Sequence, residues 1–281
     1  MRNLPIHNVR NATLAGVMAV FWCVAGPGDA AAAALVKPHR AVYELHLGAR
    51  TADSTVTNAR GKLEFEWNDV CDGWTISHRS RIALDHTTGR VDDFVWIFDS
   101  WEDKAGENYR FFVREAAGGR PVTETRGKAQ LDPSGGGLAV YSLPEEREVP
   151  LPEGTVFPGF HTLLVMETAE TGDFPLWRFV FDGNGDDGLF GISAVAMESF
   201  SAGTVPQPGA AILDSEKAWR FHLAIYGLDD RVAEPEQEQI LRLFANGVAD
   251  QLEFDYGDFT LDGRLSELEF LPDPGCQESD E

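Results

Sequence analysis

The loop that follows residue 181 places oxygen ligands at close, regular spacing. The segment FDGNGDDG offers carboxylate or amide oxygens at Asp182, Asn184, Asp186 and Asp187. A calcium loop also begins D-x-N-x-D, because alternate side chains turn toward the ion. The sixth position should then be glycine but is Asp187, and the twelfth should be glutamate but is Ser193. An acidic hairpin loop is the favoured interpretation, and a weak calcium site is the alternative.

Other residue types that catalyse reactions are present but are not grouped in a recognised pattern. The seven histidines show no HExxH or HxxEH spacing, so no zinc site is indicated. Residues 191–195 (GISAV) come nearest to a nucleophile elbow but lack its second glycine. His161 lies in an apolar stretch, where a hydrogen-bonded packing residue is favoured over a ligand. We therefore predict no enzyme activity, metal or cofactor, and keep His161, Asp182 and Asp186 as interaction candidates.

The first residues have the pattern of a secretory signal peptide. A basic start is followed by the apolar run 12–25 (ATLAGVMAVFWCVA), which is too short to cross a bilayer as a helix. The small-residue tract 29–35 (DAAAAAL) then supplies a cleavage site near Ala33 or Ala34. We therefore expect residues 1–34 to be a cleaved leader and the mature protein to be periplasmic, without a membrane span.

Cleavage of this leader would remove Cys23 and leave two cysteines, Cys71 and Cys276, 205 positions apart. An exported chain with two cysteines favours one intramolecular disulfide, while two free thiols or an intermolecular bridge remain the alternatives. Cys71 lies in the segment DVCDGWTISH, whose Asp72-Gly73 pair is typical of a type I′ hairpin turn. A cysteine beside a tight turn would offer a fixed attachment point for the end of the chain.

The composition is strongly acidic. The chain has 23 lysine and arginine residues against 46 aspartate and glutamate residues, which gives a formal net charge of −23. Such a surface repels phosphate backbones and anionic lipid headgroups. Nucleic acid is therefore excluded as an expected partner.

Most of the remaining chain has the pattern of β-strands. Residues 62–67 (KLEFEW) alternate apolar and charged side chains, which buries one face. In 92–101 the intervening Val95 and Ile97 are apolar too, which predicts cover on both faces. About a dozen such runs indicate an antiparallel β protein. The expected strands are 39–47, 62–67, 74–84, 92–101, 107–115, 176–183, 189–198, 217–227, 238–247, 248–263 and 264–271.

Two segments interrupt this pattern. The breaker-rich stretches 131–137 and 143–154 concentrate proline, glycine and acids, and we interpret them as the join between two halves of one molecule. The segment 158–172 (PGFHTLLVMETAETG) predicts a helix, because Pro158 suits a first turn and Gly172 suits the position after the last one. This helix is apolar on most sides, which predicts a sheet wrapped around it.

Several of these segments match one known family, in order and over nearly the whole mature chain. The chain resembles the EipB family of periplasmic cell-envelope integrity proteins. The matching pieces are HRAVYEL, the CDGW turn, PEGTVFPGFHTL, FDG, ANGV followed by LEFDYGDFTL, and LSELEFLPDPGC. Gly159 departs mildly from the family pattern, in which a small polar residue is expected before FHT.

The resemblance carries several expectations. It implies a single all-β domain over 35–281, an antiparallel β-spiral of two half-barrels (about 35–130 and 138–281), with the helix near 158–171 packed inside the second half. It also implies a disulfide between Cys71 and Cys276, no catalytic reaction, and a periplasmic partner of tetratricopeptide-repeat type.

Three functions follow from the sequence. The first is a non-enzymatic periplasmic factor that supports envelope integrity by protein–protein interaction. The alternative is a carrier of lipid or lipoprotein, in which the clustered aromatic residues line a site for an acyl chain instead of filling a core. The third is an enzyme such as a hydrolase. A filled barrel would favour the first function, and a cavity of several hundred Å3 would favour the carrier.

Overall fold

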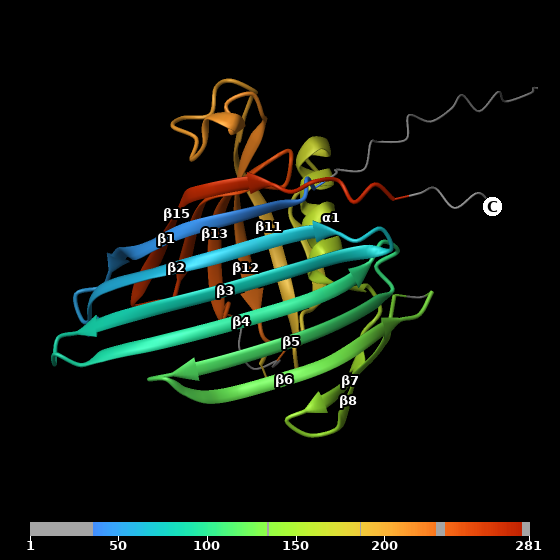
Figure 1. Ribbon diagram of the computed structural model, residues 1–281, viewed down its shortest axis with the longest axis horizontal. Coiled ribbons are helices and arrows are strands. Elements are labelled where there is room, and N and C mark those ends of the chain that lie inside the picture. The colour runs from blue at the N-terminus through green and yellow to red at the C-terminus, as the bar shows by residue number, and fades with distance from the viewer. Residues whose placement is uncertain (1–35, 134, 186, 229–233, 277–281) are drawn as a thin grey trace, which may run out of the picture. The chain divides into compact units, whose positions relative to one another are not determined.

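The computed structural model describes residues 36–133, 135–185, 187–228 and 234–276. These residues fall within a single compact unit, made almost entirely of antiparallel strands (Figure 1). The leader assigned to residues 1–34 lies outside the described residues. The boundaries of the two halves, near 130 and 138, stay a prediction.

Fifteen strands, one α-helix and one short 3-10 helix are found in the described part of the chain. The earlier strands are β1 His39–Arg50, β2 Val56–Asp69, β3 Gly73–His86, β4 Val91–Asp103, β5 Asn108–Ala117, β6 Arg120–Leu131, β7 Gly137–Leu143 and β8 Arg147–Leu151. The later elements are β9 Thr155–Val156, α1 Pro158–Thr171, β10 Leu176–Phe181, β11 Leu189–Phe200, the 3-10 helix Ala211–Leu213, β12 Ala218–Tyr226, β13 Gln237–Phe244, β14 Ala249–Asp255 and β15 Phe259–Phe270.

The strands form one sheet, in the order β8-β7-β6-β5-β4-β3-β2-β1-β15-β14-β13-β12-β11-β10-β9. All neighbours are antiparallel except the short β9–β10 pair. The two ends of the chain meet at β1, where Ala41 lies opposite Phe65 of β2 on one side and Leu268 of β15 on the other. In Figure 1 the strands β1–β6 run across β11–β13 while β15 lies beside β1, and together the strands make a nearly closed, barrel-like sheet. The predicted fold class is thereby confirmed.

The alternation of side chains sets an inner and an outer face on each strand. On β1 the predicted apolar face is buried at Ala41, Tyr43 and Leu45. The prediction that β4 is covered on both faces is wrong, because Val95 and Ile97 are only half-buried on the outer face. Their cross-strand partners on β3 are Arg81 and Arg79. The stems of these long side chains can shield apolar neighbours without a second layer of structure.

The helix α1 has the predicted bounds, Pro158–Thr171. Gly172 ends it with φ 80°, the left-handed conformation that favours glycine, and its N–H bonds to the carbonyl of Thr168. Val165 and Met166 are buried in a core cluster that includes Trp67, Ile76 and Phe98 of β2–β4 as well as Phe181, Trp219 and Phe221 of β10 and β12. The helix therefore packs against both groups of strands.

The hairpin between β2 and β3 differs from its prediction by one residue. Positive φ occurs at Cys71 (φ 71°), and the turn is closed by Val70 N–H bonding to Gly73 O at 3.0 Å. The central pair is therefore Cys71-Asp72. Gly73 is instead the buried first residue of β3, where a Cβ would collide with the carbonyl of Glu102 on β4. This glycine serves the close approach of two strands and does not provide a left-handed turn.

Candidate functional site

The inner faces of the strands line a cavity of about 630 Å3 that is partly open to solvent, since its lining residues Phe94 and Val122 are 40% and 62% exposed. Its lining is mostly apolar and comes from β1 to β6 on one side and from β13 to β15 on the other. The main apolar contributors are Leu45, Leu63, Ile82, Leu84, Phe94, Trp96, Val122, Phe254, Phe259 and Leu261. A volume of this size is typical of sites for small molecules and cofactors. The barrel is therefore not completely filled by its own side chains.

A smaller cavity of about 240 Å3 lies beside the larger one. The two share Leu63, His78, Gln239 and Phe254 as lining residues, so they adjoin. The smaller cavity reaches α1, which contributes the side chains of His161, Thr162 and Val165. The larger, apolar cavity therefore adjoins a region that contains imidazole groups.

The interaction candidate His161 lies in this smaller cavity. Its Nε2 is buried and has no hydrogen-bond partner in the described part of the chain, a feature that the predicted packing role does not explain. Burial, with a smaller effect from the charge of Arg178, lowers the pKa of His161 to about 4. The imidazole is therefore neutral at pH 7.

The conformation of the acidic loop bears on the calcium hypothesis. Asp182 turns back on its own loop, where Oδ1 accepts the N–H of Asn184 at 2.7 Å. Burial raises the pKa of Asp182 to about 7, although the backbone N–H groups that its carboxylate accepts act in the opposite direction. Among the described residues no group of three or more histidine, cysteine, aspartate or glutamate side chains is arranged to hold a metal ion. Asp186 lies outside the described residues, so its role stays a prediction.

The inward-facing Glu102 of β4 was missed by the sequence analysis. Its carboxylate accepts the N–H groups of Gly159 and Phe160, both at 2.8 Å, and so satisfies the first turn of α1 from another part of the sheet. A Cβ on Gly159 would lie 2.7 Å from Glu102 Oε2, which explains why glycine is found there. Burial raises the pKa of Glu102 to about 7, although the two N–H donors favour the charged form.

The stability of the protein should therefore depend on pH through Glu102. A folded pKa of about 7, above the ordinary 4.5, stabilises the folded state fully below pH 4.5 and loses that effect as the pH rises through 7. Relative to Glu102→Gln, the wild type should lose up to about 3 kcal/mol of unfolding free energy between pH 5 and pH 8. Urea unfolding of both proteins across this range measures the difference.

The comparison with Glu102→Gln is needed because the buried histidines change the pH dependence of stability in the opposite direction. Burial lowers the pKa of His78 and of His161 to about 4, so their stabilising effect is lost as the pH falls from 6.5 toward 4. These histidines are present in both proteins and cancel in the difference. A difference that is independent of pH would show that Glu102 has an ordinary pKa.

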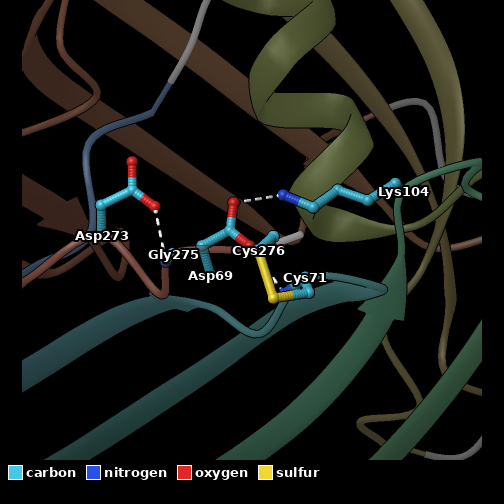
Figure 2. Close-up of a disulfide and its surroundings, with 6 residues drawn as sticks. All are labelled: Asp69, Cys71, Lys104, Asp273, Gly275 and Cys276. Carbon is cyan, nitrogen blue, oxygen red and sulfur yellow. Dashed lines mark hydrogen bonds and ion pairs between the residues drawn. A yellow bond between two sulfur atoms is a disulfide. The ribbon is translucent and has the colours of Figure 1, made fainter. Parts of the chain in front are cut away.

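The disulfide joins the β2–β3 hairpin to the end of the chain. Cys71 and Cys276 are bonded with their Cα atoms 5.5 Å apart (Figure 2). On the hairpin side, Asp69 accepts the N–H of Cys71 at 2.8 Å and also pairs with Lys104. The hairpin end of the bond is therefore held by neighbouring side chains, as the sequence analysis expected of a fixed attachment point.

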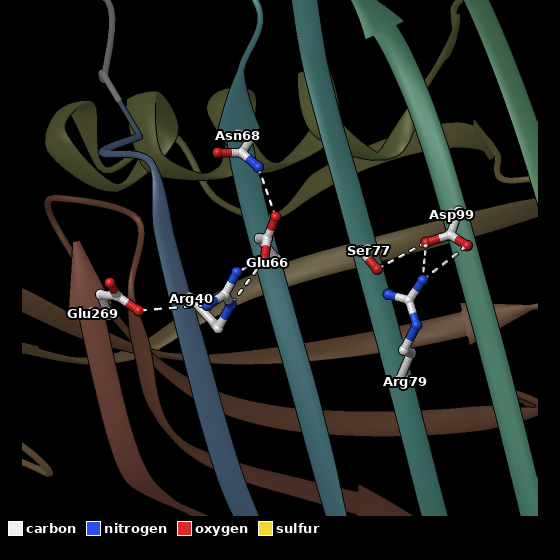
Figure 3. A network of polar contacts seen from close by, with 7 residues as sticks. All are labelled: Arg40, Glu66, Asn68, Ser77, Arg79, Asp99 and Glu269. Carbon is white, nitrogen blue, oxygen red and sulfur yellow. Dashed lines mark hydrogen bonds and ion pairs between the residues drawn. The ribbon is translucent and has the colours of Figure 1, made fainter. Parts of the chain in front are cut away.

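The outer face of β1–β4 carries cations that are matched by carboxylates. Figure 3 shows Arg40 of β1 held by Glu66 of β2 at 2.7 Å, and Arg79 of β3 held by Asp99 of β4 at 3.0 Å. Ser77 donates to the same Asp99 at 2.8 Å. These pairs are solvent-exposed, and each contributes little to stability. They neutralise this part of the surface.

Comparison with known proteins decides the family. The family model described as EipB-like matches residues 30–272. The chain belongs to the EipB-like family. The cell envelope integrity protein EipB of Brucella abortus (strain 2308) is 28% identical over 268 residues, covering 92% of this chain and 93% of that protein. The crystal structure of a β-barrel-like protein of a domain of unknown function, DUF1849, also from Brucella abortus, superposes with a TM-score of 0.76 at 25% identity, covering 85% of this chain and 99% of the other.

Membership of the EipB-like family confirms the resemblance found in the sequence. It supports a role in envelope integrity, since that is what the name of the relative describes. No helix in the described part of this EipB-like chain is both long and apolar enough to cross a membrane. A disulfide in a family of this kind is consistent with an exported protein.

Proposed function

We propose that this EipB-like chain is an exported, non-enzymatic periplasmic factor that supports envelope integrity by holding the acyl chain of a lipid or lipoprotein in its interior cavity. The cavity of about 630 Å3 carries the proposal, because a mostly apolar cleft of this size is typical of sites for small apolar ligands. On this ground we favour the carrier function over the protein-interaction function that the sequence analysis preferred. The clustered aromatic residues Phe94 and Trp96 then serve as lining of the cavity.

The position of the cavity also suits an apolar ligand. It lies between strands from the two ends of the chain, so small movements of one group against the other would change access to it. The helix α1 occupies only part of the interior, with Val165 and Met166 buried against the core. Burial of an acyl chain in the remaining space is favourable by roughly 0.8 kcal/mol for each CH2 group.

Filling the cavity should abolish binding. We expect the wild type to bind the apolar fluorophore 1-N-phenylnaphthylamine and Leu84→Trp to bind it at least about 10-fold more weakly, because the larger ring occupies space that the ligand needs. Ile97→Trp, on the outer face of β4, is the matched control and should bind like the wild type. Fluorescence titration measures all three affinities. Failure of the wild type to bind, or equal binding by Leu84→Trp, would contradict the proposal.

One observation favours protein–protein interaction, with a tetratricopeptide-repeat partner as the family expectation. Arg110 and Lys128 lie directly opposite each other on β5 and β6, and neither makes an ion pair with a described residue. Arg110 stacks on Trp101 at 4.9 Å, and Arg126 stacks on Phe112 at 5.2 Å. Like charges opposite each other destabilise a sheet, and exposed arginine with aromatic rings is typical of binding hot spots. If Arg110→Glu no longer bound an envelope protein that the wild type binds, while its fluorophore binding stayed unchanged, this function would be favoured.

A further inference from the structure

Four buried nitrogen atoms without hydrogen-bond partners belong to residues that line the smaller cavity. They are Nε2 of His39, Nε1 of Trp67, Nε2 of His78 and Nε2 of His161. Only one other such side-chain atom, Nδ2 of Asn246, occurs in the described part of the chain. The side chains of His39, Trp67 and His161 are 0%, 3% and 6% exposed. Because buried polar groups are normally paired, this concentration in one cavity points to a ligand that pairs with them.

The fold brings these groups together from three strands and the helix. His39 of β1 and Trp67 of β2 are direct cross-strand partners on the inner face of the sheet. Phe65 lies between the imidazoles of His39 and His78, with ring centroids 5.5 Å and 6.3 Å away. His161 approaches from α1. All four residues therefore line the same cavity, and His78 also lines the larger apolar cavity.

The hydrogen-bonding roles of two of these atoms can be assigned. Nδ1 of His39 lies 2.8 Å from the carbonyl oxygen of Lys37, and a carbonyl only accepts, so Nδ1 carries the proton. Burial lowers the pKa of His39, which keeps the ring neutral at pH 7 and leaves Nε2 as an acceptor. Nε1 of Trp67 can only donate. The cavity therefore presents one fixed acceptor beside one fixed donor.

The charge of the lining limits the ligand further. Neither cavity has a lysine or arginine among its described lining residues, whereas Glu115 lines the larger cavity and Glu253 the smaller. A phosphate or carboxylate group would find no cation in the described lining to compensate for the hydration that it loses there. The polar group of the ligand should therefore be uncharged.

We infer that the smaller cavity binds an uncharged polar group that both donates and accepts a hydrogen bond, a hydroxyl or an amide, on an acyl chain that extends into the larger cavity. This inference rests on the proposed function and adds the chemical class of the ligand. The hydroxyl or amide hydrogen is donated to His39 Nε2, and the oxygen accepts from Trp67 Nε1–H. His78 and His161 are neutral at pH 7 and line the same cavity.

A pair of matched probes tests the inference on the intact protein. 1-Decanol donates and accepts, whereas decyl methyl ether only accepts and is the more apolar molecule. A purely apolar cavity would prefer the ether. We expect the wild type to bind 1-decanol about 10-fold more tightly, measured by displacement of 1-N-phenylnaphthylamine, because the ether leaves the acceptor of His39 unpaired.

Two variants assign the preference to the named atoms. His39→Phe should lose the preference for 1-decanol while keeping its affinity for the ether, because it removes only the acceptor. Trp67→Phe should weaken both probes about equally, since both accept from its N–H. His46→Phe, on the exposed side of β1, and Trp74→Phe, beside Trp67 but outside both cavities, are the matched controls. Thermal unfolding confirms that each variant is folded.

The wild-type ratio decides the inference even if a variant fails to fold. Equal or tighter binding of the ether would overturn the inference and leave the acyl-binding proposal standing. Displacement of the bound fluorophore by neither probe would also overturn the inference, and failure of the fluorophore itself to bind would overturn both the inference and the proposed function.

Discussion

Replacement of Asp250 by asparagine is expected to lower the free energy of unfolding by about 3–5 kcal/mol, because it leaves a buried arginine without its counter-ion. Arg242 of β13 and Asp250 of β14 form a two-point pair, with Nε 2.8 Å from Oδ1 and Nη2 2.7 Å from Oδ2. Their side chains are 6% and 0% exposed. Solvent therefore cannot screen the positive charge of Arg242 that remains unpaired after the substitution.

The same pair also anchors the segment between β11 and β12. Arg242 donates to the carbonyl oxygens of Pro206 and Gln207, and Asp250 accepts the N–H of Gly209 at 2.8 Å. Asp250→Asn should therefore also loosen residues 206–209, which hydrogen exchange would detect as faster exchange there than in the wild type.

Urea unfolding with two companion proteins checks this prediction. Asp93→Asn breaks the exposed pair with Arg81 and should change the unfolding free energy by less than about 1 kcal/mol. The double variant Arg242→Met/Asp250→Leu removes both charges and should be clearly more stable than Asp250→Asn. A single variant as stable as Asp93→Asn would show that water reaches the pair.

Local sequence patterns were sufficient to predict most elements of this fold. Alternation at Leu63 and Phe65 identified the centre of β2, although the strand begins earlier, at Val56. Pro158 and Gly172 set the bounds of α1, because one suits a first turn and the other a left-handed end.

Two turns were placed wrongly because several residues nearby suit a turn. The stretch predicted as a strand over 248–263 in fact divides at Gly257, whose φ is 86°, so that β15 runs unbroken through residue 264. In the β2–β3 hairpin the left-handed residue is Cys71, whereas Gly73 is required for packing. Turn chemistry alone does not distinguish these uses of glycine.

Prediction of the candidate site required information that the sequence of a single strand does not contain. The alternation of β4 places Glu102 on the inner face with Trp96 and Phe98, which was a usable signal of a buried acid. Its partner, the first turn of α1, lies 57 positions away and follows only from the tertiary arrangement. In the same way, the pairing of His39 with Trp67 requires the register of β1 and β2.

Loss of the disulfide is the second large expected effect. The chain-entropy treatment assigns roughly 5 kcal/mol to a link across 205 positions, because the bond removes many conformations from the unfolded chain. The net loss of stability should be smaller than this figure, because removal of the bond also frees part of the folded chain. Leu271 N–H still bonds to the carbonyl of Pro38 at 2.8 Å, but residues 272–276 are exposed. Without the bond this tail gains freedom in the folded protein as well, so we expect a loss of about 2–4 kcal/mol.

Cys71→Ser, Cys276→Ser and the double variant should all lose the same amount, because each removes one shared bond. Urea unfolding of the oxidised proteins measures the three losses, and thiol titration of the unfolded, unreduced wild type should find no free thiol. Losses that add in the double variant would show that the cysteines act separately. The hairpin should keep its shape in every case, since Asp69 and Lys104 hold it independently of the bond. The bond therefore acts mainly on the exposed end of the chain, where it fixes the residues that follow β15 beside the β2–β3 turn.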